Sequence, residues 1–201
     1  MEEDGEVMID PYRFKANKAI DFAGWITARE FGVTATQVAS GATPAGFRDL
    51  VIELRDPQPI EDNGYMKFGR DQEGPISLWV KSGFEIMPNE WLIAHEDNSK
   101  YLATPDGLSL DHTSISEIKT TGKDWNPENI PIKYRRQVQW QLYVTGAERC
   151  LFAWMLRAET FGMFVPAWID PKHVWIDRDE EMISDLSAVA DRVLEAVRGD
   201  A

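Results

Sequence analysis

Segments with helical and with strand-like patterns alternate along the whole chain, and this alternation limits the fold more than any other sequence feature. Apolar residues at every third or fourth position indicate a helix, and strict alternation of apolar with polar residues indicates a half-buried strand. No internal repeat and no Gly/Ser-rich linker divides the chain, so the pattern predicts one α/β or α+β domain. Helices are expected at 14–30, from Thr34 or Thr36 to Gly41, at 65–80, at 131–146 and at 180–197, and strands at 84–94, 100–104, 115–120, 151–158 and 174–176.

Prolines and glycines mark the expected breaks in this pattern. A loop is predicted after Gly41, where both residue types follow, and the stretch Asp56-Pro57-Gln58-Pro59 predicts a second break. Gly74-Pro75 predicts an interruption of the helix over 65–80, or its start.

The charged residues are distributed unevenly. The 201 residues carry a formal net charge of −13, which by itself argues against a nucleic-acid partner, because proteins bind phosphates with Lys and Arg. Residues 1–12 carry five acids and no base, and residues 176–201 carry eight acids and three bases. The stretch 13–175 has a net charge of only −3. We therefore expect an acidic tail over 1–12 and a single domain over 13–201, and the body of the chain is compatible with binding DNA in one place.

The composition argues against several other classes of protein. No run of eighteen apolar residues occurs and the N-terminus is acidic, so neither a membrane span nor a signal peptide is expected. The single cysteine, Cys150, allows no disulfide within the chain and fits a reducing cytoplasm. The three histidines lack zinc-ligand spacing, and the sequence has no Gly-x-Ser-x-Gly motif and no complete P-loop.

The strongest candidate for a catalytic site is a predicted hairpin that contains Asp106, Glu117 and Lys119. Residues two apart on a strand share a face, so Glu117 and Lys119 should project together while Ile118 points into the core. Carboxylates are the oxygen ligands that Mg²⁺ prefers, and a nearby ammonium can orient and activate a water molecule. Asp106, on the partner strand or its bend, would supply a second carboxylate. The alternative is an exposed cross-strand ion pair without a catalytic role.

Three further segments each allow a functional and a purely structural interpretation. Arg29, followed by hydroxyls at a helix start (Thr34-Ala35-Thr36), suits an anion or phosphate site, or else a capped helix beside a surface arginine. Glu73 is a candidate carboxylate on a helix, or a solvated glutamate. Gln137 and Gln141 share one helical face beside two arginines, which is also typical of a polar outer surface.

A series of short motifs runs from Gly24 to Asp179 and covers most of the chain. In chain order they are Gly24-Trp25-x-x-x-Arg29 followed by Thr34-Ala35-Thr36, Gly69-x-x-x-Glu73, Thr104-Pro105-Asp106-Gly107-Leu108, Glu117-Ile118-Lys119, Tyr134-x-x-Gln137-Val138-Gln139-x-Gln141-x-x-Val144-Thr145, and Asp177-Arg178-Asp179-Glu180. Each motif is weak alone, but in this order the set resembles the lambda-exonuclease-like (YqaJ-type) phage recombination exonucleases, within the PD-(D/E)xK nuclease superfamily. The resemblance implies a restriction-endonuclease-like core, in which helices flank a central mixed β-sheet.

The resemblance also implies a metal-dependent catalytic centre. Asp106 and Glu117, with the backbone carbonyl of Ile118, would hold a catalytic Mg²⁺, and Lys119 would orient the attacking water. Glu73 matches a helical glutamate near the metal site and would serve a second ion. Two Mg²⁺ ions are therefore expected, and Mn²⁺ is a candidate substitute.

Further residues match family positions outside this centre. Gln137 matches a glutamine that contacts metal-bound water or the scissile region. Arg29, Thr36 and Thr104 match residues that hold the 5′-phosphate of the DNA end, with threonine at 36 in place of the more usual serine. Glu96 or Asp97 stands about ten residues before the Pro-Asp motif, where the family usually has an aspartate, and the spacing fits Glu96 better.

By resemblance, the chain is expected to be a Mg²⁺-dependent 5′→3′ exonuclease that degrades one strand of linear double-stranded DNA. A ring-shaped homotrimer, a phage single-strand-annealing protein as partner, and a phage or prophage origin in a bacterial host are also implied. The alternatives are another PD-(D/E)xK deoxyribonuclease, either an endonuclease or a non-toroidal exonuclease, and a DNA-end-binding recombination module that does not cut.

Overall fold

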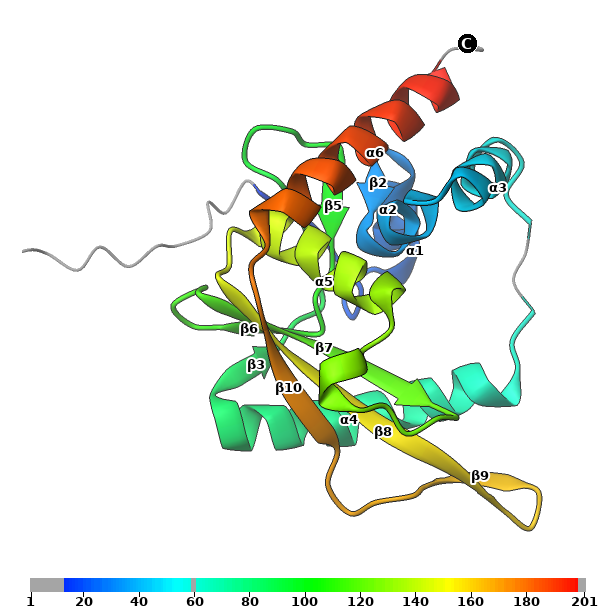
Figure 1. Cartoon of the computed structure of the whole chain (residues 1–201), viewed down its shortest axis with the longest axis vertical. Helices are drawn as coiled ribbons and strands as arrows, with labels where there is room; N and C mark the ends of the chain where they lie inside the picture. The colour runs from blue at the N-terminus through cyan, green and yellow to red at the C-terminus, as the bar shows by residue number, and fades with distance from the viewer. Residues whose placement is uncertain (1–12, 59–60, 199–201) are drawn as a thin grey trace, which may run out of the picture.

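The computed structural model describes residues 13–58 and 61–198, and within these residues six α-helices surround two β-sheets (Figure 1). The predicted acidic tail over 1–12 lies outside the described residues. The larger sheet has the strand order β10-β8-β7-β6-β3 with β9 paired to β8, and the smaller sheet has the order β1-β4-β5-β2. The strands are β1 (Phe14–Asn17), β2 (Val33–Thr34), β3 (Ile86–Pro88), β4 (Trp91–Ala94), β5 (Tyr101–Ala103), β6 (Gly107–Ser109), β7 (Ser114–Thr121), β8 (Arg149–Thr160), β9 (Met163–Pro166) and β10 (Lys172–Asp177). The helices are α1 (Phe22–Glu30), α2 (Ala35–Gly41), α3 (Pro44–Arg55), α4 (Gly64–Phe84), α5 (Ile132–Thr145) and α6 (Glu180–Arg198).

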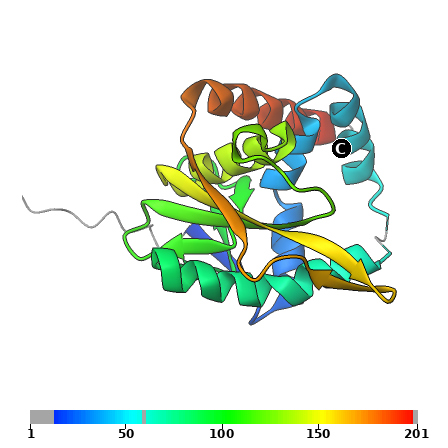
Figure 2. The same cartoon turned by 60° about the horizontal axis from the view of Figure 1, so that its bottom comes forward.

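The larger sheet is mixed, because β7 runs parallel to β8 and antiparallel to β6. Figure 2 shows this sheet between α4 on one side and α5 and α6 on the other. Ile76 and Val80 of α4 pack against Ile118 of β7 in one core cluster. Val138 and Leu142 of α5 belong to a second cluster with residues of β7 and β8. The predicted mixed sheet flanked by helices is therefore confirmed.

Helix α5 also packs against the smaller sheet and so links the two sheets. Its Trp140 and Val144 join a core cluster with Tyr101 of β5 and Leu186 of α6. The indole N–H of Trp140 donates to the carbonyl oxygen of Leu102 at 3.1 Å. Because apolar neighbours cover α5 on both sides, its glutamines are buried as well, and they must find hydrogen-bond partners inside the protein.

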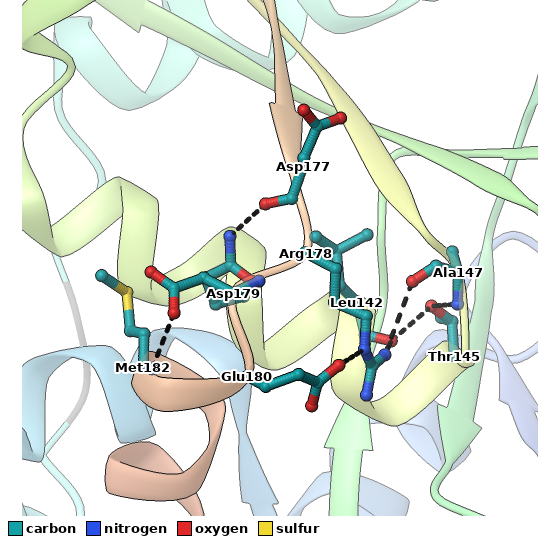
Figure 3. A network of polar contacts seen from close by, with 9 residues as sticks. Leu142, Thr145, Ala147, Asp177, Arg178, Asp179, Glu180 and Met182 are labelled. Carbon is teal, nitrogen blue, oxygen red and sulfur yellow. Dashed lines mark hydrogen bonds and ion pairs between the residues drawn. The ribbon is translucent and has the colours of Figure 1, made fainter.

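The junction between β10 and α6 is tied to α5 by polar contacts, which Figure 3 shows from close by. The side-chain amide of Gln139 donates to the carbonyl oxygen of Asp177 and accepts from the backbone N–H of Asp179, both at 2.8 Å. The guanidinium of Arg178 donates to the carbonyl oxygen of Leu142 at 2.8 Å. The motif Asp177-Arg178-Asp179-Glu180 therefore anchors α6 against α5.

The N-terminal region differs from the predicted helix over 14–30. Residues 14–17 form strand β1, in which Phe14 pairs with Ile93 of β4, and the helix begins only after Asp21. The carboxylate of Asp21 accepts from the backbone N–H of Gly24 at 2.9 Å and caps α1. Pairing with a distant strand overrides the local helical pattern here.

The loop predicted after Gly41 is also wrong, because Pro44–Arg55 forms helix α3. Pro44 stands in the first turn, where a missing N–H costs nothing, and the hydroxyl of Thr43 accepts from Gly46 N–H at 3.1 Å. Helix α4 runs through Pro75 without the predicted interruption and extends from Gly64 to Phe84. No helix in the described part of the chain is both long and apolar enough to cross a membrane.

Candidate active site

Strand β7 places Glu117 and Lys119 on one face of the larger sheet. Ile118 points to the opposite face and packs against α4, as strand alternation requires. Glu117 is only 2% exposed, and the ammonium of Lys119 donates to its Oε1. The predicted shared face is therefore present. The alternative of an exposed ion pair is wrong, because the carboxylate is buried.

Asp106 lies at the bend just before β6 and faces the same strand. Its backbone N–H donates to the carbonyl oxygen of Ser116 at 2.9 Å, and its Oδ2 accepts from the N–H of Ile118 at 2.6 Å. The next position, 107, requires glycine, because a Cβ there would lie 2.3 Å from Ser116 Oγ. The Pro-Asp-Gly sequence thus lets the two strands approach closely enough to bring Asp106 beside Glu117.

Two glutamines of α5 hold the Glu117 carboxylate from the other side. Gln137 Nε2 donates to Oε1 at 2.6 Å, and Gln141 Nε2 donates to Oε2 at 2.7 Å. Both glutamines are buried, so the polar outer surface considered for this face is wrong. Sequence reasoning assigned a role only to Gln137. The signal for Gln141 was its position four residues further along the same helical face.

Burial and like charge perturb the ionisable groups of this centre. Burial, and next the negative charge of Glu117, raise the pKa of Asp106 well above its ordinary value. Burial alone would lower the pKa of Lys119, but the charges of Glu117 and Asp106 outweigh it, and the pKa lies above its ordinary value. One ammonium thus faces two carboxylates. A further cation would relieve the remaining repulsion.

A cleft of about 170 Å³, called here the phosphate cleft, opens beside these groups. Arg29 lines it, and its guanidinium stacks 4.3 Å from the ring centre of Trp25. Burial lowers the pKa of Arg29 from its ordinary value, though not enough to remove the charge near neutral pH. The remaining lining includes Lys18, Thr34, Thr36, Glu73, Thr104, Asp106, Gln137 and Gln141. Residues from α1, α2, α4 and α5 therefore meet at one opening.

Two polar atoms at this cleft are buried and have no hydrogen-bond partner in the described chain. They are the indole N–H of Trp25, which is a donor, and the amide Oε1 of Gln141, which is an acceptor. Buried polar groups without partners are costly, so their presence here indicates a place for a polar ligand or water. Trp25 is a site residue that sequence reasoning treated only as part of a motif.

A second cleft, of about 460 Å³, adjoins the first. Glu73 and Asp106 line both clefts, so the two openings meet at these residues. Glu73 is partly exposed and lies 3.5 Å from the ammonium of Lys18. The further lining of the second cleft is Tyr65, Met66, Gly69, Ile118, Lys119, Thr120 and Arg157.

Glu96 is the one predicted site residue that the structure does not bring to the site. It is exposed and follows β4, and it lines neither cleft. Glu96 lies in the turn that precedes β5, whereas Asp106 follows the end of β5, so the two residues lie at opposite ends of this strand. The segment between Glu96 and Asp106 includes β5, and it places Glu96 away from the catalytic centre. The histidines of the described chain also line neither cleft.

The described residues contain no ready-made cluster of three or more His, Cys, Asp or Glu side chains that could hold a metal ion. The oxygen-rich centre nevertheless fits a divalent cation. Glu117 is buried and Asp106 is half-buried, and the ammonium of Lys119 balances only one of their two negative charges. The backbone carbonyl of Ile118 directly follows Glu117 in sequence. Mg²⁺ binds through one or two carboxylates together with water and substrate oxygens, so a larger cluster is not required.

Comparison with known proteins agrees with this arrangement. The family described as the YqaJ-like viral recombinase domain matches residues 24–148. The uncharacterized protein YqaJ of Bacillus subtilis (strain 168) is 31% identical over 110 residues, which are 52% of this chain but only 31% of that relative. The chain therefore matches about a third of the length of this curated relative.

Solved structures share the fold. An alkaline exonuclease, LHK-Exo from Laribacter hongkongensis, superposes with a TM-score of 0.71 and 25% identity, covering 88% of this chain and 92% of that one. The same enzyme in complex with dAMP gives 0.72 at 24% identity with the same coverage. A phage-related exonuclease from Haemophilus somnus 129PT gives 0.65 at 13% identity, covering 83% and 93%. With the motifs of residues 24–148 placed on this shared fold, the chain belongs to the family of YqaJ-like viral recombinase domains.

Proposed function

We propose that this protein is a Mg²⁺-dependent exonuclease that degrades one strand of linear double-stranded DNA from its 5′ end. The observation that carries the proposal is that Asp106, which lines both clefts, lies beside Glu117 and Lys119. A non-cutting DNA-binding module has no need for a buried carboxylate such as Glu117 with a second, half-buried carboxylate beside it, because this arrangement costs stability. The similarity to an alkaline exonuclease at 25% identity supports a nuclease.

The carboxylates of Asp106 and Glu117 and the carbonyl of Ile118 would hold the catalytic Mg²⁺, and Glu73 would contribute to a second ion. Bound there, the metal would offset the negative charge that develops on the phosphate and would help to activate water. Lys119 orients the attacking water with its ammonium, which its neighbours keep protonated. Gln137 and Gln141 fix the orientation of the Glu117 carboxylate.

The phosphate cleft would bind the terminal 5′-phosphate. Arg29, Thr36 and Thr104 line it with a guanidinium and two hydroxyls. The unpaired indole N–H of Trp25 is a further donor for a phosphate oxygen. The dAMP complex of the related LHK-Exo is a precedent for a deoxynucleotide ligand on this fold. Placing the 5′-phosphate on one side of the carboxylates would set the polarity of degradation.

The family relationship also supports a role in phage-type homologous recombination. Single-stranded tails left by the exonuclease would be the substrate of a single-strand-annealing protein. We also propose a homotrimer that encloses the duplex, and one domain over residues 13–201. A mass measurement in solution tests the trimer directly.

End-labelled linear duplex and closed circular DNA, each incubated with Mg²⁺ or with EDTA, test this function. We expect loss of the linear duplex only with Mg²⁺, and an intact circle. Cleavage of the circle would indicate an endonuclease instead. Binding of linear ends without cleavage in either buffer would favour the recombination module that does not cut.

A further inference from the structure

The second cleft contains a cation that the proposed function does not use. Arg157 of β8 lines this cleft together with Glu73, Asp106 and Lys119. Its guanidinium lies 4.3 Å from the ring centre of Tyr65 and 5.5 Å from that of Phe164. The two rings are themselves 5.1 Å apart. Because the rings come from α4 and β9, three elements together hold the arginine at the wall of the cleft.

The guanidinium of Arg157 has no carboxylate partner within residues 13–58 and 61–198, and none of its side-chain N–H groups makes a hydrogen bond there. Stacking on rings holds a guanidinium while leaving its edge free to donate. The facing position is Gly122, where a Cβ would lie 3.0 Å from Nη2 of Arg157. A planar, permanently charged group with free donors suits a phosphate, which it can contact through two parallel hydrogen bonds.

The position of Arg157 relative to Arg29 indicates which phosphate it would meet. The two arginines lie in different clefts, and these clefts share only Glu73 and Asp106. If the terminal 5′-phosphate occupies the phosphate cleft and the cleaved bond lies at the carboxylates, the rest of the strand continues into the second cleft. We propose that Arg157 binds a backbone phosphate of the substrate DNA on the 3′ side of the cleaved bond. This inference rests on the proposed function.

The test measures KM and kcat for release of the first nucleotide from a 5′-phosphorylated duplex. We expect Arg157→Ala to raise KM about tenfold or more, because a charged hydrogen bond to phosphate is lost, with a smaller change in kcat. Arg157→Lys keeps the charge and should recover part of the loss. The slope of log affinity against log salt should fall by about one for Arg157→Ala.

A second arm identifies the phosphate. Duplexes carry a single uncharged methylphosphonate at the second, third or fourth linkage from the 5′ end. At one of these linkages the modification should raise KM for the wild-type protein. It should leave KM for Arg157→Ala at the value found with unmodified duplex, because the substitution and the modification remove the same contact. If the modification weakens both proteins equally at every linkage, the proposal is overturned.

Arg149→Ala is the matched control. Arg149 lies on the same strand about 26 Å away, at 3.3 Å per residue, and its guanidinium stacks 4.3 Å from the ring centre of Trp175. It lines neither of the two clefts, so KM should stay at the wild-type value. An equal rise in KM for both variants, or a wild-type KM for Arg157→Ala, contradicts the inference while leaving the exonuclease intact. If the wild-type protein degrades no duplex, the proposed function fails first, and this inference fails with it.

Discussion

Replacing Gln141 by leucine removes one of the two amide donors that hold Glu117 while keeping a side chain of similar size. Gln141 is 1% exposed and its Nε2 lies 2.7 Å from Glu117 Oε2, so no water readily replaces the lost bond. A hydrogen bond to a buried charge contributes about 1.5–3 kcal/mol. In a protein of this size the loss corresponds to a fall of about 3–12 °C in Tm. We expect this fall in EDTA, and a smaller one with Mg²⁺, whose charge would compensate Glu117.

Gln139→Leu is the control for this prediction. Gln139 is equally buried on the same helix, but its amide bonds to the backbone of Asp177 and Asp179 rather than to a charged side chain. Gln139→Leu should therefore lower Tm by similar amounts in EDTA and in Mg²⁺, and the folded protein should keep its cleavage rate. Thermal unfolding, monitored by circular dichroism, gives the Tm in EDTA and the Tm in Mg²⁺. If Gln141→Leu unfolds at the wild-type temperature in EDTA while Gln139→Leu is destabilised, Gln141 does not hold Glu117 as described.

Three further substitutions probe separate parts of the site. Lys119→Ala should abolish cleavage but keep binding to duplex ends, as measured by fluorescence anisotropy; cleavage at the wild-type rate would remove its proposed role. Arg29→Ala should slow degradation of 5′-phosphorylated ends more than of 5′-hydroxyl ends, whereas an equal loss on both would show that it does not read the phosphate. Asp106→Asn should inactivate the protein yet stabilise it in EDTA at neutral pH. The stability that the Asp106 carboxyl contributes is complete below its ordinary pKa of 3.8 and is lost as the pH rises through its raised pKa in the folded protein. If Asp106→Asn is less stable than the wild-type protein at pH 7, burial does not penalise the charge of Asp106.

Local chemistry explains why the centre of the site could be predicted from the sequence. The alternation at Glu117, Ile118 and Lys119 fixes which side chains share a face, and the Pro-Asp-Gly bend brings Asp106 to the adjacent strand. The structure brings these groups together as predicted. Their catalytic roles stay predictions. Glu96 lies away from this centre, because a spacing in sequence does not show in which direction a strand carries the chain.

Errors arose where distant segments decide the local structure. Strand β1 forms because residues 14–17 pair with β4, which is far away in sequence, and no local pattern records that partner. Helix α3 was predicted as a loop because Pro44 was interpreted as a breaker rather than as a first-turn residue. Arg157 gave no sequence signal at all, since its setting depends on rings from α4 and β9.

The polarity of degradation tests the central claim most directly. The same blunt duplex, 5′-phosphorylated on both strands, is labelled either at a 5′ end or at a 3′ end and digested with Mg²⁺. We predict that the 5′ label is released at once as a mononucleotide, while the 3′ label stays on a strand that shortens progressively. Early release of the 3′ label, or internal fragments that carry the 5′ label, would contradict a 5′→3′ exonuclease built on Asp106 and Glu117.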